Sequence, residues 1–171
     1  MSVERSVFES VQVLRLSRPE KRNALTRDMY RTLADSLEAG DADASIRVSV
    51  ILGSGGHFTG GNDIADFLAT AEGEQGAVPA PGVPANGMPE AASSLLMPRL
   101  MGYPRAFEML VLGETFSAAR ACDAGLVNAL VDPEALEVLV LAVAARLAKK
   151  PQHAVITAKR LMRSGSAAVL E

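Results

Sequence analysis

The order of apolar segments in the first third of the chain limits it to a small set of folds. A short apolar run at residues 11–16 predicts a strand, and a second run at residues 48–52 predicts another. Between them, Thr26 is a typical helix N-cap, and apolar residues then recur at the four-residue spacing of a buried helix face. The pair Gly60-Gly61 predicts a sharp turn soon after the second strand. Strand, helix, strand and turn form a βαβ unit, so we expect an α/β layer architecture.

Two further expectations follow from this pattern. Gly40 is expected to end the helix, because glycine commonly follows the last helical residue. The strand at residues 48–52 is mostly apolar, so we expect it to be buried on both faces, as where helices cover a sheet.

The second half of the chain reads as helical, with a brief strand expected at residues 126–131. Residues typical of helix starts and ends alternate there: starts at Pro104, Ser117 and Pro133, and ends at Gly113, Gly125 and Pro151. By length the 171 residues predict one domain, which we divide into a core at residues 1–97 and a helical C-terminal region at residues 98–171.

Composition narrows the classes of partner. The net charge of −3, with no dense Lys/Arg stripe, argues against nucleic acid as a partner. The single cysteine, Cys122, fits a reducing compartment. Residues 1–5 show no start of a signal peptide, and no apolar run is long enough to cross a membrane. A cytoplasmic location without membrane contact is therefore expected.

The glycine-rich turn at residues 57–64 is a candidate site. Gly60 and Gly61 allow a turn whose backbone N–H groups are unpaired and point into a cleft. Two such donors aimed at one oxygen stabilise the charge that develops on a carbonyl. The alternative is a plain turn between a strand and a helix. No GxGxxG pattern is present, so a nicotinamide cofactor is not supported.

Glu90 is a candidate general base. It lies between Pro89 and the small residues 91–94, which would let a substrate approach closely and where Ser93 or Ser94 could cap a helix. A carboxylate in such an apolar pocket has a raised pKa, as a general base needs. The alternative is a solvated residue at a helix entry. The two histidines are far apart in the sequence and give no metal-ligand spacing.

Four segments together resemble the crotonase superfamily, the enoyl-CoA hydratase/isomerase fold. They occur in the family's order and cover nearly the whole chain: residues 18–25, like the opening loop that meets the nucleotide end of coenzyme A; 57–64, like the first oxyanion-hole loop; 95–102 with 106–113, like the helix pair after the active site; and 119–131, like the "AxxAGLVN" turn. The resemblance implies a ββα spiral core followed by a C-terminal helical region.

Two details are similar to the peroxisomal-type enoyl-CoA isomerase branch. Asn62 stands where hydratases more often have alanine, and residues 89–94 resemble the motif that holds that branch's glutamate base. By this resemblance the Asn62 N–H would bind the thioester oxygen, and Glu90 would move a proton from C2 to C4 of a 3-enoyl-CoA. Residues assigned to substrate binding are Lys21, Arg22, Ala24, Gly60, Gly61, Asp63 and Ile64.

The resemblance also implies an acyl-CoA substrate, no metal, and no cofactor beyond the coenzyme A of the substrate. It places the chain in fatty acid β-oxidation and implies a homotrimer or a dimer of trimers. Two other functions stay open: enoyl-CoA hydratase, and a non-catalytic member that binds coenzyme A or serves in an assembly.

The middle of the chain is shorter than the family pattern. Only 26 residues separate Asp63 from Glu90, whereas a βαβ unit alone takes roughly thirty or more. The resemblance implies that a helix, two strands and a second glycine-rich helix start are lacking, and that helix start supplies the other oxyanion N–H. Three explanations of the short middle stay open: the printed sequence omits residues of a longer chain, the protein has a true internal deletion, or the chain was shortened deliberately. The first is favoured, because loss of central strands exposes sheet edges.

Overall fold

The computed structural model describes residues 2–66 and 91–170. The described residues form two compact units, one made of residues 2–66 and 133–158, the other of residues 91–132 and 159–170. Each unit is described by itself below. Glu90 lies outside the described residues.

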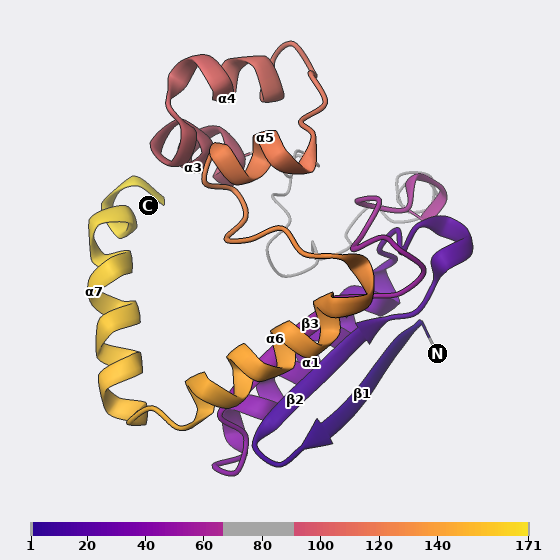
Figure 1. The fold of residues 1–171 in the computed structure, drawn as a ribbon, viewed down its shortest axis with the longest axis vertical. Coiled ribbons are helices and arrows are strands. Elements are labelled where there is room, and N and C mark those ends of the chain that lie inside the picture. Colours follow the sequence, from indigo (N-terminus) through magenta and orange to yellow (C-terminus); the bar gives the residue numbers. More distant parts are fainter. Residues whose placement is uncertain (1, 67–90, 171) are drawn as a thin grey trace, which may run out of the picture. The chain divides into compact units, whose positions relative to one another are not determined.

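The first unit is built on a three-stranded sheet (Figure 1). Strand β1 (Val3–Phe8) pairs antiparallel with β2 (Val11–Leu16), and β2 pairs parallel with β3 (Val48–Gly53). Helix α1 (Arg27–Ala42) connects β2 to β3, after a short 3-10 helix η1 (Pro19–Lys21). The expected βαβ unit and α/β class are therefore confirmed.

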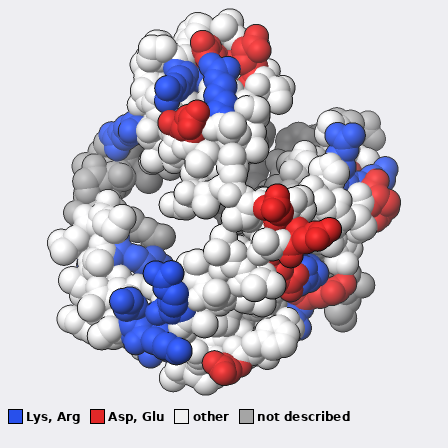
Figure 2. Space-filling model, in the orientation of Figure 1, with Lys and Arg blue, Asp and Glu red and all other residues white. Residues whose placement is uncertain are grey.

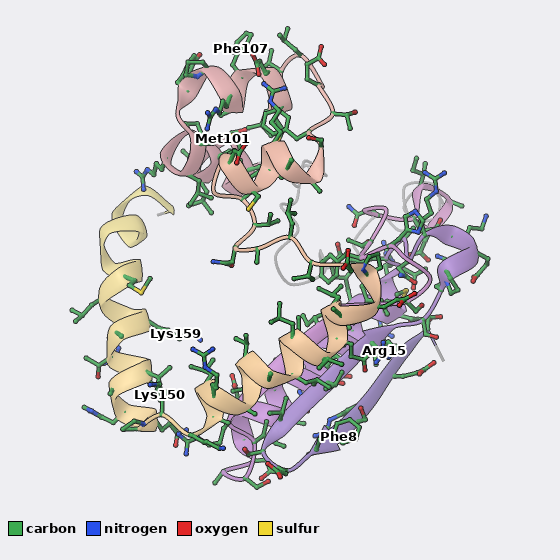
Figure 3. All side chains as sticks on the ribbon, in the orientation of Figure 1. Phe8, Arg15, Met101, Phe107, Lys150 and Lys159 are labelled. Atoms are coloured by element: carbon green, nitrogen blue, oxygen red, sulfur yellow. The ribbon has the colours of Figure 1, made fainter. Side chains whose placement is uncertain are left out.

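Alternation along β2 sends its side chains to two helices. Val11 and Val13 pack with Ala144 of α6 (Pro133–Ala148), whereas Leu16 packs with Met29 of α1. Figure 3 labels Arg15, which points to the α6 side and bonds Glu137 through Nη2 at 2.6 Å. The central strand is thus buried on both faces.

Strand β3 is buried on one face only among the described residues, contrary to expectation. Val50 and Leu52 are buried in the cluster with α6. On the other face, Ser49 is exposed and Ile51 is 37% exposed. The opposite face differs because α1 packs on β1 and β2 and leaves β3 partly uncovered.

Gly40 does not end α1, which continues to Ala42. Glycine at this position allows the Gln12 side chain to approach α1 closely, because a Cβ at Gly40 would lie 2.9 Å from Nε2 of Gln12. Gln12 is fully buried on β2, accepts from Arg5 Nε at 2.6 Å and donates to Ser36 O of α1 at 3.0 Å. The buried amide is therefore paired, as burial requires, and glycine provides the space for it.

The second unit contains α3 (Ala91–Met101), α4 (Tyr103–Leu110) and α5 (Ala118–Asp123). Met101, Ala106 and Ala124 form its core. α3 begins at Ala91, so Ser93 and Ser94 lie inside its first turn and are not its cap.

The strand expected at residues 126–131 does not form in the second unit. Ser117 caps α5 as predicted, through Oγ and the Arg120 N–H. Gly125, at φ 77°, then ends α5 in the left-handed conformation, and the Leu126 N–H bonds Ala121 O at 2.9 Å. Leu126 packs against the unit's core. Residues 126–131 therefore begin as part of a helix C-cap and form no strand.

The last helix, α7 (Gln152–Leu170), follows Pro151. Lys149, Lys150 and Arg47 form a basic cluster where α6 ends; Figure 3 labels Lys150, and Figure 2 shows blue side chains in this region. Arg47 Nη2 donates to the Lys150 carbonyl at 2.8 Å, and cations at this end suit the helix dipole. No helix within the described residues is both long and apolar enough to cross a membrane.

Candidate active site

Two loops meet at the carboxyl ends of β2 and β3. One runs from Arg18 to Leu25, the other from Ser54 to Asp63. The Ser54 N–H donates to Leu16 O at 3.0 Å, where the two loops leave the sheet. In open α/β sheets this edge of parallel strands is the usual place for a ligand.

The buried side chain of Asn23 links the two loops by hydrogen bonds. Its side chain is fully buried; Nδ2 donates to Ser54 O at 2.8 Å and to His57 O at 2.7 Å, while Oδ1 accepts from the Arg18 N–H at 2.8 Å. Its φ of 55° is left-handed, a conformation that Asn tolerates better than most residues. The amide therefore satisfies three backbone groups that the loops would otherwise leave unpaired.

An ion pair joins the loops a second time. Arg18 Nη1 lies 2.6 Å from Asp63 Oδ2 and also donates to Ala24 O at 3.1 Å. The side chains are 20% and 13% exposed. The hydrogen bond from Arg18, followed by that from the Asp66 N–H, lowers the pKa of Asp63, while partial desolvation opposes this shift.

Leu25 orients the backbone around Asn62. The Leu25 N–H donates to Gly61 O at 2.7 Å, and the Asp63 N–H donates to Leu25 O at 2.9 Å. In a trans peptide the C=O and the N–H point in opposite directions, so the Asn62 N–H points away from Leu25. Within the described part of the chain this N–H makes no hydrogen bond. The result is an oriented backbone donor on an exposed turn.

The turn itself depends on Thr59 and Gly61. Thr59 Oγ1 donates to Asn23 O at 2.9 Å and accepts from the Gly61 N–H at 3.1 Å. Gly61 has a φ of 89°, which favours glycine strongly. Next to it, the Tyr30 hydroxyl of α1 lies 2.7 Å from Asn62 Oδ1.

The structure brings the predicted site residues together, with one exception. Lys21 and Arg22 are exposed on the first loop beside Ala24, whose carbonyl is bound by Arg18. The remaining five lie on or directly after the glycine turn: Gly60, Gly61, Asn62, Asp63 and the 73% exposed Ile64. The exception is Glu90, whose placement lies outside the described residues. No group of three His, Cys, Asp or Glu in the described ranges could hold a metal ion.

Four residues that build the site were not assigned a role from the sequence: Arg18, Asn23, Tyr30 and Thr59. Arg18, Asn23 and Thr59 lie within the motifs at residues 18–25 and 57–64, so membership of these motifs was a signal that could have identified them. Tyr30 lies in the first turn of a helix and carries no local signal.

Comparisons with known proteins identify relatives of this chain. A family model described as enoyl-CoA hydratase/isomerase matches residues 7–86 and 80–171. Human enoyl-CoA delta isomerase 2 is 25% identical over 91% of this chain and 52% of its own length. The 2,3-dehydroadipyl-CoA hydratase of Escherichia coli is 25% identical over 95% of this chain and 82% of its own.

The fold is shared with solved structures of that family. A putative enoyl-CoA hydratase/carnithine racemase from Magnetospirillum magneticum is 34% identical, with a TM-score of 0.83 over 95% of this chain and 82% of that chain. The expected crotonase-like fold is therefore confirmed. The chain spans about half the length of the first curated relatives it matches.

The alignments also confirm that internal segments are lacking. The human alignment runs over 207 positions, whereas 91% of 171 residues is about 156, so about 50 positions face gaps in this chain. The Escherichia coli alignment, with 209 positions and 95% of this chain, gives a similar difference. The two matched segments of the family model share residues 80–86. The match to the family model is therefore interrupted near residues 80–86, which lie between Asp63 and Glu90 in the sequence.

Proposed function

This chain belongs to the enoyl-CoA hydratase/isomerase family, and we propose on that basis that it moves the double bond of a 3-enoyl-CoA to the 2-position. The observation that carries the proposal is the Asn62 N–H, which Leu25 directs away from the loop pair and which makes no hydrogen bond within the described residues. A free, oriented backbone donor is what a developing oxyanion needs. The names of the human and rat relatives support the isomerase assignment.

The proposed reaction needs one base and no water. The Glu90 carboxylate takes a proton from C2, and the electron pair forms an enolate whose charge falls on the thioester oxygen. The Asn62 N–H donates to that oxygen. Glu90 then returns the proton to C4, so the C3–C4 double bond is lost and a C2–C3 double bond is formed. Atoms and electrons balance within the substrate, and we propose no metal or separate cofactor.

The other assigned residues bind the substrate in this proposal. Lys21 and Arg22 present exposed cations to the phosphates of coenzyme A. Ala24 lies between them and the turn, while Gly60, Gly61, Asp63 and Ile64 shape the thioester end of the site. Asp63 acts through its ion pair with Arg18, which keeps the two loops at a fixed distance.

The test is Glu90→Gln, compared with Glu38→Gln on the exposed face of α1 as a matched control. Conversion of 3-enoyl-CoA to 2-enoyl-CoA is followed by the absorbance of the conjugated thioester, and hydration by its loss. We expect E90Q to lower kcat for isomerisation by about 10²-fold or more, with E38Q unchanged. Equal isomerisation in E90Q and E38Q rejects Glu90 as the base, and faster hydration than isomerisation in the wild type favours a hydratase.

A non-catalytic member that binds coenzyme A is the second candidate. The observation in its favour is the stretch of about 50 aligned positions that this chain lacks. If that stretch holds the second oxyanion donor, the rate falls by about 10²–10³-fold. Calorimetric binding of coenzyme A in a protein without turnover of either enoyl-CoA is the result that selects this candidate.

We also propose a homotrimer or a dimer of trimers in the cytoplasm. Large apolar side chains on α6 support an assembly because they are exposed in the single chain: Leu136, Val138, Leu139, Val143 and Leu147. Analytical ultracentrifugation tests the proposal, and a monomer at micromolar concentration would contradict it.

A further inference from the structure

Tyr30 reaches from α1 to the glycine turn. Thr26 caps α1, and the Tyr30 N–H bonds Thr26 O at 3.0 Å, so Tyr30 is fixed in the first helical turn. Its hydroxyl lies 2.7 Å from Oδ1 of Asn62. The amide oxygen of an Asn only accepts hydrogen bonds, so the Tyr30 O–H is the donor. The half-buried ring is held by the helix, and its hydroxyl engages one atom of the candidate oxyanion turn.

The Asn62 side chain is a potential competitor for the donors of this turn. Asn side-chain oxygens readily accept hydrogen bonds from nearby backbone N–H groups, including the group two residues later. The N–H groups of Asn62 and Ile64 make no hydrogen bond within the described residues. An Asn62 Oδ1 released from Tyr30 has both groups within its local reach. An alanine at position 62 would carry no such acceptor.

We propose that Tyr30 is a positioning residue for the Asn62 N–H. By donating to Oδ1, the Tyr30 hydroxyl withholds this acceptor from the backbone donors of the turn and leaves the Asn62 N–H available to the substrate. Leu25 sets the direction of the N–H independently, through its hydrogen bonds with Gly61 O and the Asp63 N–H. The inference rests on the proposed function, because it assigns the Asn62 N–H to the thioester oxygen.

A double-mutant cycle tests the inference, since it isolates the coupling between two residues in contact. Tyr30→Phe removes only the hydroxyl, and Asn62→Ala removes the side-chain amide while keeping the backbone N–H. We expect Y30F alone to lower kcat by about three- to tenfold, the usual effect of one neutral hydrogen bond, with KM within about twofold. In the N62A background, Y30F should have no further effect. Tyr103→Phe, on an exposed tyrosine of α4, is the control and leaves kcat unchanged.

An equal loss of kcat from Y30F in both backgrounds overturns the inference, because Tyr30 would then act independently of the Asn62 side chain. An unchanged kcat in Y30F overturns it as well. A merely structural role for Tyr30 predicts lower stability in both backgrounds without this dependence on residue 62.

A second measurement separates this inference from the proposed function. Hexanoyl-CoA, a saturated thioester, is titrated into ¹⁵N-labelled protein, and the Asn62 backbone amide resonance is followed. We expect a shift in the wild type and a shift reduced at least twofold in Y30F at saturation. No shift in the wild type overturns the proposed function, and this inference with it. The same full shift in wild type and Y30F overturns this inference alone.

Discussion

Arg18 and Asp63 form the ion pair that joins the two loops of the candidate site, with Nη1 and Oδ2 at 2.6 Å. The pair lies at the start of one loop and the end of the other, 45 residues apart in sequence. Arg18 also binds the Ala24 carbonyl, so one guanidinium fixes both loops. A charge-assisted contact of this kind makes the geometry of the turn sensitive to pH.

Asp63 should therefore stabilise the fold at neutral pH and lose that effect in acid. The hydrogen bond from Arg18 lowers the pKa of Asp63 in the folded state below its ordinary value near 4. A group whose folded pKa is lowered contributes stability above its unfolded pKa, and this contribution is lost as the pH falls through the folded pKa. Urea unfolding of wild type and Asp63→Asn at pH 7, 5, 4 and 3 measures the difference.

We expect the stability gap between wild type and D63N to be constant from pH 7 to about 5 and to shrink below about pH 4. Asp35→Asn, on the exposed side of α1, is the charge-matched control. A gap that does not change between pH 5 and 3 would show that the Arg18 contact does not form in solution.

Asn23→Ala should be one of the most destabilising single substitutions in the first unit. It leaves Ser54 O, His57 O and the Arg18 N–H without their partner in a buried place. Each buried polar group left unpaired costs about 1–3 kcal/mol, and water entering the space recovers part of this. We expect a loss of about 3 kcal/mol in the free energy of unfolding, measured by urea denaturation.

The control for this prediction is Asn128→Ala, on an exposed residue of the second unit. It should change stability by less than about 0.5 kcal/mol. Similar effects of N23A and N128A would contradict the role assigned to Asn23.

Gly53, the last residue of β3, and Gly56, on the loop that follows, give a pair of glycine substitutions to compare. A Cβ at Gly53 would lie 2.0 Å from His57 O, which is backbone and cannot move alone. At Gly56, which has a φ of 77°, a Cβ meets nothing within 4 Å. We expect Gly56→Ala to cost about 1–2 kcal/mol through its left-handed backbone alone. Gly53→Ala should cost more than about 3 kcal/mol, seen as a lower thermal midpoint, and equal midpoints in G53A and G56A would refute this account.

The core of the first unit was predictable because its sequence periodicity is strong. Residues 11–16 and 48–52 are mostly apolar, and α1 carries a cap and a regular apolar stripe. β1 was missed because it is an edge strand: all of Val3–Phe8 except Val3 is exposed, and its polar residues hide the strand pattern. The prediction that Gly40 ends the helix was wrong because glycine at this position makes room for Gln12, a residue far away in the sequence.

The candidate site was predictable where motifs are local and not where contacts are distant. Residues 18–25 and 57–64 were both identified, since each is a continuous stretch with a recognisable pattern. The function of Asn23 depends on Ser54 and His57, which lie more than thirty residues away. Tyr30 depends on Asn62 in the same way. Such pairings arise only when the parallel strands bring both loops to one edge of the sheet.

Lys21 and Arg22 should bind coenzyme A through charge. Both are exposed on the first loop, and exposed cations gain modestly from each contact with phosphate. Lys21→Ala and Arg22→Ala should each raise the Kd for coenzyme A by about three- to tenfold at low salt, as measured by isothermal titration calorimetry. Because salt screens exposed charges, the effect should shrink when the ionic strength rises. Lys149→Ala, in the basic cluster at the end of α6, is the matched control; an equal weakening by K149A would show that coenzyme A responds to overall charge and not to this loop.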